Sequence, residues 1–298
     1  MKLNLEKQPK AVCLIHADFD QADIAKAKQE ALKYLSEEKE YKGFRKGKTP
    51  LEVVEKNTNE NVLKEYIVNQ LATLASVKAV QENKLQPIIS PQATVEKFSW
   101  EEIVLNIQLV EQPPVTLGDY KDKIKEALEK KSPAGQIAAA TTLAEAAKEG
   151  SSDKEYQEPA LTFPEIIEAI KQTCHAEVAD ILIEKEMNSR LGQLVNRIEA
   201  LGMRVEQYLE SQNKNIDQLR QEYRQQAKET LEIEFIMQEI AQKEGHQVTD
   251  QDVADAIQAA PDEKSRKEFE SEDKKEYIRT VLKRSKTLLA MSKGQFVN

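Results

Sequence analysis

The sequence predicts an α+β N-terminal domain (β-α-α-β-β, antiparallel sheet) followed by an all-α elongated helical domain. Three observations lead to this fold class. Strand-like stretches rich in β-branched residues gather in residues 1–113. From Leu161 to the end of the chain, apolar residues recur at helical spacing. Charged residues make up 32% of the 298 residues and aromatic residues only 5%, a composition typical of long, solvated helices.

The first half of the N-terminal domain is predicted to hold one strand and two helices. Ala11–Phe19 is dense in β-forming residues and predicts a strand, and an amphipathic helix follows to about Glu40. The basic stretch KGFRKGKTP, residues 42–50, interrupts that helix, because glycine is unfavourable in a helix interior. The next helix begins near Pro50, a good first-turn residue, and continues to about Glu82.

The second half of this domain is predicted to complete the sheet. Residues 85–98 contain two prolines and several β-branched residues, which indicates edge strands. Residues 101–112 alternate between apolar residues and a more polar set, which is typical of a half-buried strand. The basic stretch therefore lies at the tip of a helix pair.

Composition changes after the sheet. Glu111–Tyr120 holds two prolines and a glycine and predicts a domain boundary. Ala134–Pro159 is rich in Ala, Ser, Thr and charge, which indicates a weak helix followed by a linker.

The remaining chain predicts successive helices. A continuous apolar pattern runs from Leu161 to a stop at Gly202. Thr249 and Asp252 have the spacing of a capping box. The other predicted helices cover about Val205–Ser211, Asp217–Lys243 and Asp273–Met291. The last has the apolar stripe Tyr277, Val281 and Leu288. Such stripes are in general more often core than exposed binding surface, so the sequence does not show which apolar residues face a client.

Charge is unevenly distributed along the chain. The formal net charge is -9, yet residues 1–50 contain 11 Lys and Arg against 8 Asp and Glu, a net of +3. The remaining chain therefore carries -12. A basic front end on an acidic body indicates that the two parts face different partners.

Sequence signals for catalysis and cofactor binding are lacking. Neither GxxxxGK[ST] nor GxGxxG occurs, and no pattern places two carboxylates in one apolar pocket. Cys13 and Cys174 form no CxxC motif and are expected to be free thiols. Cys174 and His175 do not face each other if they are adjacent on a helix. We therefore expect no catalytic residue, no metal and no cofactor.

The sequence also lacks an apolar N-terminal targeting region and any apolar run of membrane-spanning length. These features predict a cytoplasmic protein that does not enter a membrane.

The basic stretch around Phe44 has three interpretations. It is a solvated turn without a role, a nucleic-acid contact in which cations neutralise phosphates and Phe44 stacks on a base, or a protein-docking element with Phe44 as its apolar anchor. A ribosome would supply both surfaces.

The stretch GFRKGKTP resembles the signature of the bacterial trigger factor family of ribosome-associated chaperones, a pattern close to Gly-Phe-Arg-x-Gly-Lys-[Val/Ala]-Pro. Thr49 stands where the family usually has a small apolar residue. The order of predicted elements and the exit PPVTLGDYK are also similar, so the resemblance covers about residues 1–121. Beyond it, VADILIEKEMNSRL resembles a helix start of the family, with Ala179 where a proline is usual. The sequence from Gln225 to Val253 resembles its C-terminal helical arms.

The resemblance implies a ribosome-binding loop that docks at the tunnel exit against a ribosomal protein and neighbouring RNA. Phe44 would bury apolar area, Arg45 would pair with a carboxylate or phosphate, and Lys46 would steer the encounter. The implied ribosome-binding residues are Gly43, Phe44, Arg45, Lys46, Gly47, Lys48 and Pro50.

One departure concerns the FKBP-type prolyl isomerase domain of roughly a hundred residues that the family usually carries between these parts. Only residues 120–160 are left for it, and they are Ala-rich and linker-like. We therefore expect a ribosome-binding domain at 1–113, a linker or arm segment without an isomerase domain at 114–160, and a helical client-binding domain at 161–298.

The function implied is an ATP-independent, ribosome-associated chaperone that shields nascent chains in a helical cradle. Its partners would be the ribosome and unfolded or nascent polypeptides, and a weak homodimer stays open. Two alternatives remain: a peptidyl-prolyl cis-trans isomerase, and a helical scaffold that binds a single protein partner. The residues that contact clients are not identified by the sequence.

Overall fold

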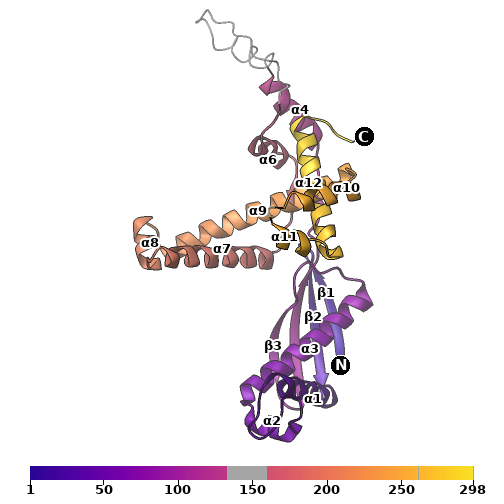
Figure 1. Ribbon diagram of the computed structural model, residues 1–298, viewed down its shortest axis with the longest axis vertical. Helices are drawn as coiled ribbons and strands as arrows, with labels where there is room; N and C mark the ends of the chain where they lie inside the picture. Colours follow the sequence, from indigo (N-terminus) through magenta and orange to yellow (C-terminus); the bar gives the residue numbers. More distant parts are fainter. Residues whose placement is uncertain (133–159, 261, 298) are drawn as a thin grey trace, which may run out of the picture. The chain divides into compact units, whose positions relative to one another are not determined.

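The computed structural model describes residues 1–132, 160–260 and 262–297, and Figure 1 shows its secondary structure. The chain divides into two compact units, Met1–Pro114 and Val115–Asn298, which we call the N-terminal unit and the C-terminal unit. A sheet with helices forms the first, and helices dominate the second, so the predicted fold class is confirmed. The weak helix and linker expected over Ala134–Pro159 lie outside the described residues.

A four-stranded antiparallel sheet forms the frame of the N-terminal unit. Its order is β1-β2-β4-β3, with bounds β1 Lys2–Gln8, β2 Val12–Asp20, β3 Gln92–Phe98 and β4 Glu102–Val110. The sequence-based prediction lacked β1. Its period-2 signal rests on Leu3 and Leu5 alone, among charged and amide residues. Pairing with β2 across the turn that contains Lys10 and Ala11 makes this polar segment a strand.

Three helices belong to this unit: α1 Gln21–Glu38, α2 Leu51–Asn57 and α3 Glu60–Asn83. The Asp20 side chain caps α1 by accepting hydrogen bonds from the backbone N–H groups of Ala22 and Asp23. The single helix predicted from Pro50 is two helices. Thr58 is extended and Asn59 caps α3, so the chain turns between α2 and α3.

The core of the N-terminal unit lies between one face of the sheet and the helices. Figure 1 shows α3 crossing the strands, and α1 packs beside it. Alternate side chains of β2 and β4 are almost fully buried and meet α1 and α3: Cys13, Ile15, Ala17, Phe19, Ile103, Leu105, Ile107 and Leu109. This alternation is what the sequence predicted for β4.

The C-terminal unit contains a two-residue strand pair and eight described helices. The strand pair breaks the helix predicted from Leu161 to Gly202, because residues 175–176 pair with residues 115–116. A short helix after residue 262 was also not predicted. The elements are β5 Val115–Thr116, α4 Tyr120–Lys131, α6 Phe163–Lys171, β6 His175–Ala176, α7 Asp180–Ala200, α8 Val205–Ser211, α9 Ile216–Glu244, α10 Asp250–Gln258, α11 Glu263–Glu268 and α12 Glu272–Ser292.

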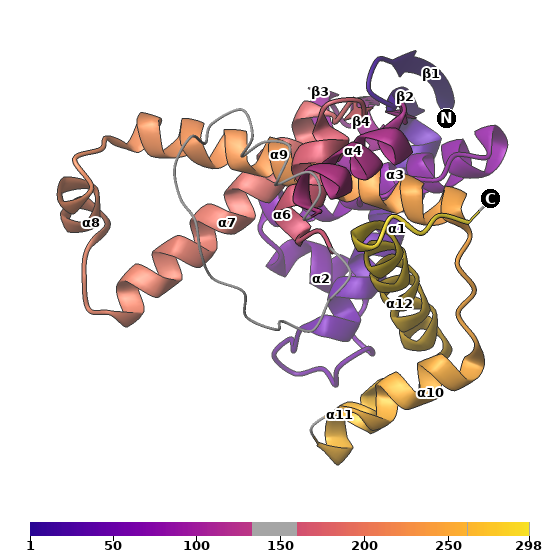
Figure 2. The same cartoon turned by 90° about the horizontal axis from the view of Figure 1, so that it is seen from above.

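Helices α7 and α9 pack against each other. Helix α8 lies in the connection between them, as Figures 1 and 2 both show. Leu194, Ile198 and Leu219 form a small buried cluster near α8. The start of α9 is capped by a capping box, in which Asn215 and Gln218 each accept a hydrogen bond from the other's backbone N–H.

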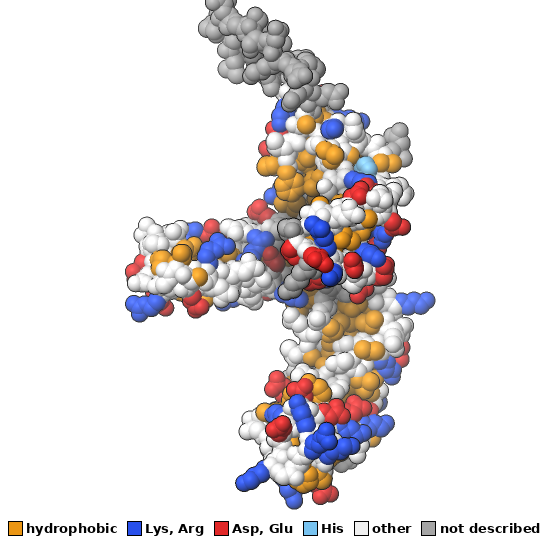
Figure 3. Space-filling view, in the orientation of Figure 1, with side chains coloured by type: hydrophobic (Ala, Val, Ile, Leu, Met, Phe, Trp, Pro, Cys, Tyr) orange, Lys and Arg blue, Asp and Glu red, His pale blue; other side chains and the backbone are white. Residues whose placement is uncertain are grey.

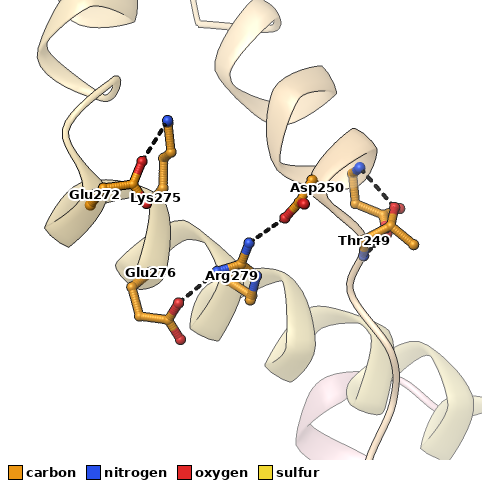
Figure 4. A network of polar contacts seen from close by, with 7 residues as sticks. Thr249, Asp250, Glu272, Lys275, Glu276 and Arg279 are labelled. Carbon is orange, nitrogen blue, oxygen red and sulfur yellow. Dashed lines mark hydrogen bonds and ion pairs between the residues drawn. The ribbon is translucent and has the colours of Figure 1, made fainter.

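Polar contacts hold α10 to α12 (Figure 4). The Arg279 guanidinium contacts Asp250 on α10 and Glu276 on its own helix, each at 2.6 Å. The predicted capping box is present, since Thr249 Oγ1 accepts from the Asp252 N–H at 3.2 Å and Asp252 accepts from the Thr249 N–H at 2.7 Å. Lys286 of α12 also contacts Asp252 at 2.8 Å. Ionic contacts thus link α10 to α12, while Val253 of α10 is buried.

A buried carboxylate joins three distant parts of the C-terminal unit. Glu244, at the end of α9, is 1% exposed. It accepts hydrogen bonds from the Tyr120 hydroxyl at 2.6 Å, Lys121 Nζ at 3.0 Å and the backbone N–H of Val297 at 2.8 Å. The Phe296 ring packs edge-on against Tyr120. We call Glu244, Tyr120, Lys121 and Val297 the carboxylate hub.

Candidate functional site

The basic stretch forms a loop of two consecutive turns between α1 and α2. The backbone N–H of Phe44 donates to Tyr41 O at 3.0 Å, and the N–H of Lys48 donates to Arg45 O at 2.9 Å. Gly43 and Gly47 occupy the third position of each turn with φ of 87° and 77°. Such turns need a positive φ at that position, which glycine adopts without steric penalty. We call residues 42–50 the basic loop.

Backbone contacts fasten the basic loop to the helices on either side. The N–H of Gly47 donates to Ser36 O in α1 at 2.8 Å, so the second turn lies against the end of that helix. Pro50 forms the N-cap of α2, and its carbonyl accepts from the N–H of Val53 at 2.9 Å. Tyr41 packs against the domain core just before the loop. The loop is therefore short, tied at both ends and defined in shape.

The side chains that the sequence singled out point to solvent. Phe44 is 41% exposed. Lys42, Arg45, Lys46 and Lys48 are all exposed, and none of them forms an ion pair with another residue of the described chain. The loop therefore presents four cations without an ion-pair partner among the described residues, and one aromatic ring that is partly exposed. That combination suits an anionic partner with an apolar depression.

Thr49 is the residue of the loop that sequence reasoning did not place. Its side chain is buried at 6% exposure, and its hydroxyl has no hydrogen-bond partner among the described residues. It fills the base of the loop while its neighbours face outward. The departure from the small apolar residue of the family pattern was the signal available, and it marks a position where an apolar side chain would fit better.

Exposed apolar side chains form a second candidate surface, on the C-terminal unit. On α12, Tyr277 is 65% exposed and Val281 is 45% exposed. Leu288, the third residue of this stripe, is half-buried. The helix instead buries Thr287 and Met291, and reaches α10 through ion pairs. At the α8 end of the helix pair, Leu201 is 71% exposed and Ile216 49%. Figure 3 shows apolar side chains interspersed with both charge signs on the surface.

The groups with strongly shifted pKa values belong to structural contacts. The Lys131 ammonium, followed by the N–H and hydroxyl of Thr162, lowers the pKa of Glu165 to about 2. Lys286 and Thr249 lower that of Asp252 to about 2. Burial raises the pKa of Glu244, but the hydrogen bonds from Tyr120, Lys121 and Val297 outweigh it and lower the pKa below its ordinary value. Each carboxylate is engaged by partners rather than open to a substrate.

Neither a metal site nor a membrane span is found in the described part of the chain. No three His, Cys, Asp or Glu side chains there are grouped to hold a metal ion. No described helix combines the length and apolar character needed to cross a bilayer. Cys174 is buried, and desolvation raises the pKa of its thiol, so it is a poor nucleophile.

Two protein-family models match this chain, and the residues that they match are adjacent in the sequence. A family model described as bacterial trigger factor protein (TF) matches residues 1–140, and a model of the C-terminus of bacterial trigger factor protein matches residues 142–293. A separate domain of roughly a hundred residues has no room between the two. The resemblance drawn from the sequence, to a short form of the family, is confirmed.

Individual relatives agree with the family models. The trigger factors of Pelotomaculum thermopropionicum and Acetivibrio thermocellus are 31% identical over 123 residues and 30% identical over 124 residues. The trigger factor of Clostridium botulinum is 29% identical over 122 residues. Each alignment covers 41% of this chain and 28% of the relative's length.

A solved structure has the same fold. It comes from work on promiscuous substrate recognition in the folding and assembly activities of the trigger factor chaperone. The two chains superimpose with a TM-score of 0.60 at 16% sequence identity, and the superposition covers 98% of this chain and 99% of the other.

Proposed function

The chain belongs to the bacterial trigger factor family, and from this premise we propose that it is an ATP-independent chaperone that docks on the ribosome near the polypeptide exit and shields nascent chains. The observation that carries the proposal is the basic loop. Its backbone is fixed by turns and helix ends, while its four cations have no ion-pair partner among the described residues and Phe44 is partly exposed. The lack of a nucleotide motif in the sequence supports ATP independence.

Docking would use the three loop side chains in different ways. Phe44 loses its remaining exposed ring area in an apolar depression of a ribosomal protein. Arg45 forms a bidentate contact with a carboxylate or phosphate. Lys46 raises the rate of encounter with the anionic ribosome surface, an effect that salt screens. The glycines, Lys48 and Pro50 keep this shape and charge in place.

Clients would contact exposed apolar side chains of the C-terminal unit. Tyr277 and Val281 on α12, with Leu201 and Ile216 near α8, offer small apolar contacts separated by charge. Many such weak contacts hold an unfolded segment and release it readily. The acidic C-terminal part of the sequence keeps the complex in solution. We place this activity in the cytoplasm.

Ribosome co-sedimentation tests the proposal. Wild type is expected to pellet with ribosomes at low salt, and Phe44→Ala/Arg45→Ala/Lys46→Ala to stay in the supernatant. A matched control, Ile88→Ala with Lys2→Ala and Lys7→Ala, removes one apolar side chain and two cations from the same unit outside the loop. Ile88 is 41% exposed, as Phe44 is. Equal pelleting of wild type and the loop variant would contradict ribosome docking through this loop.

The two alternatives make different predictions. A prolyl isomerase would accelerate cis-trans exchange of a proline peptide, and we expect no acceleration, because the adjoining family matches leave no place for the isomerase domain. A scaffold for a single partner would neither pellet with ribosomes nor suppress aggregation of unrelated unfolded proteins. Suppression of aggregation of two unrelated clients would rule out that reading.

A further inference from the structure

A groove in the N-terminal unit lies between α1 and α3, on the side of the helix layer away from the buried strands. Its volume is about 470 Å³. Ala27 and Leu71, both buried, form its floor. The small Ala27 side chain opposite a larger one leaves the hollow. Its size is that of a site for a few side chains of a ligand.

The two walls of the groove differ in chemistry. On α3, Leu74 is 52% exposed and Val77 is 49% exposed, and the polar residues Gln70 and Thr73 line the groove beside them. On α1, Lys26 and Glu30 line the opposite wall, and neither forms an ion pair with any described residue. The α3 wall thus exposes aliphatic surface that a ligand could bury. The α1 wall offers a hydrogen-bond donor, Lys26, and an acceptor, Glu30.

We propose that this groove binds an extended, apolar segment of an unfolded polypeptide, an inference that rests on the proposed chaperone function. Aliphatic side chains of the segment pack on Leu74 and Val77. The carbonyl and N–H groups of its main chain meet Lys26 and Glu30, which lie one helical turn apart. Every polypeptide carries those main-chain groups, so recognition depends little on sequence.

The amount of exposed apolar surface argues against a folded partner. A stable dimer buries about 800 Å² on each partner, over some 20–30 residues a side, around an apolar centre. Two half-exposed aliphatic side chains supply only a small part of that centre. A single extended segment needs no more than a few such contacts to bind weakly.

Beyond the groove, α1 runs on toward the basic loop. The tyrosine rings of Tyr34 on α1 and Tyr66 on α3 lie 5.5 Å apart, one turn beyond Glu30, and Tyr34 is 45% exposed. Two residues further, Ser36 O accepts the loop hydrogen bond from Gly47. A chain held in the groove would therefore lie along α1, the helix that leads into the loop. The groove is a client contact on the docking unit itself.

Binding of a labelled, permanently unfolded protein to the full chain tests the proposal. Reduced, carboxymethylated α-lactalbumin is the probe, and fluorescence anisotropy is the measurement. Leu74→Gln with Val77→Gln removes the apolar wall at exposed helical positions where glutamine is tolerated. We expect roughly fivefold weaker binding. The matched control, Ile88→Gln with Val95→Thr, removes apolar surface of 41% and 47% exposure from the same unit and is expected to bind as wild type does.

Site-specific crosslinking locates the occupant. A benzophenone amino acid in place of Thr73, an exposed residue of the groove, is expected to crosslink to the probe, and the Leu74→Gln/Val77→Gln background to lower the yield. Unchanged affinity and yield in that background would overturn the groove proposal. Crosslinks only between two copies of this chain would also overturn it, in favour of self-association. Ribosome pelleting is measured in parallel. If wild type does not pellet with ribosomes, the proposed function is contradicted. If it pellets but no groove crosslinks form, only the groove proposal is contradicted.

Discussion

The N-terminal and C-terminal units are stabilised by different interactions. In the first, two central strands bury alternate aliphatic side chains against α1 and α3, and the exposed loop is a small appendage on that core. In the second, long helices also bury apolar side chains, among them Ile170, Met187 and Ile240, and ion pairs, capping boxes and the carboxylate hub add to this packing. The C-terminal unit thus combines a buried apolar core with more ionic contacts between its helices, and it leaves other apolar side chains, such as Tyr277 and Val281, exposed.

Acidification is expected to have the largest effect on stability. It should also lower the stability of the two units to different extents. Six described carboxyl groups of the C-terminal unit have lowered pKa values: Glu126, Glu165, Glu229, Glu244, Asp252 and Glu272. In the N-terminal unit Asp20 alone among described residues does, through its N-cap hydrogen bonds. A lowered pKa stabilises the folded state above the ordinary pKa, and this stabilisation disappears as pH falls through the folded-state value.

The C-terminal unit should therefore lose stability between about pH 5 and pH 2, and more steeply than the N-terminal unit. The single tryptophan, Trp100, lies in the N-terminal unit, so its fluorescence reports on that unit. Far-UV circular dichroism reports mainly on the helices of the other. Coincident acid transitions by both probes would contradict the difference between the units.

Truncation of a central strand residue should have the next largest effect, confined to the N-terminal unit. Ile107 of β4 is fully buried in the core. Ile107→Ala is expected to lower the free energy of unfolding by roughly 3–4 kcal/mol, because it leaves a cavity. Urea denaturation followed by Trp100 fluorescence measures this. The urea midpoint seen by circular dichroism for the C-terminal helices should not move.

Removal of the Glu244 carboxylate should instead destabilise the C-terminal unit. Glu244→Ala leaves the Tyr120 hydroxyl and the Val297 N–H without their acceptor. We expect the free energy of unfolding of the C-terminal unit to fall by about 2 kcal/mol. Tyr120→Phe removes only one of these hydrogen bonds and should lower it by about 1 kcal/mol. Urea melts followed by circular dichroism test both variants, and a stable Glu244→Ala protein would show that apolar packing dominates here too.

The smallest expected change is a gain in stability. Thr49→Val keeps the shape of a buried side chain and removes the unpartnered hydroxyl, so the N-terminal unit should become more stable by roughly 1 kcal/mol. Thr58→Val is the control of opposite sign, since its hydroxyl donates to Val54 O at 2.7 Å. Trp100 fluorescence in urea measures both. Destabilisation by Thr49→Val would mean that the hydroxyl is satisfied in solution.

Local chemistry made much of the fold predictable, and its limits are equally local. The alternation in β4, the N-cap at Asp20 and the capping box at Thr249 are short-range signals, and each is present. The strand β1 was missed because its polar sequence becomes a strand only through pairing with β2. The break at β6 depends in the same way on pairing with β5, in which Val115 pairs with Ala176 and Thr116 with His175. Long-range pairing leaves little trace in the segment itself.

The candidate site shows the same limit. The basic loop was recognisable from its residues, because glycine positions and cations are encoded locally. The burial of Thr49 depends on the neighbouring helices, and the exposure of Tyr277 and Val281 depends on which side of α12 meets its neighbours. Periodicity reveals that a helix has an apolar stripe. It does not reveal whether another element covers that stripe.

The pairing of α4 with α6 has a consequence for the length of the chain that joins them. Lys131, the last residue of α4, contacts Glu165 in the first turn of α6 at 2.7 Å, and the two helices pack together. The chain thus departs from and returns to neighbouring points of one scaffold. Lengthening or shortening a connection between adjacent anchor points changes the entropy of closure only slowly. A change in the length of the chain between Lys131 and Glu165 is therefore expected to leave the packing of α4 against α6 intact.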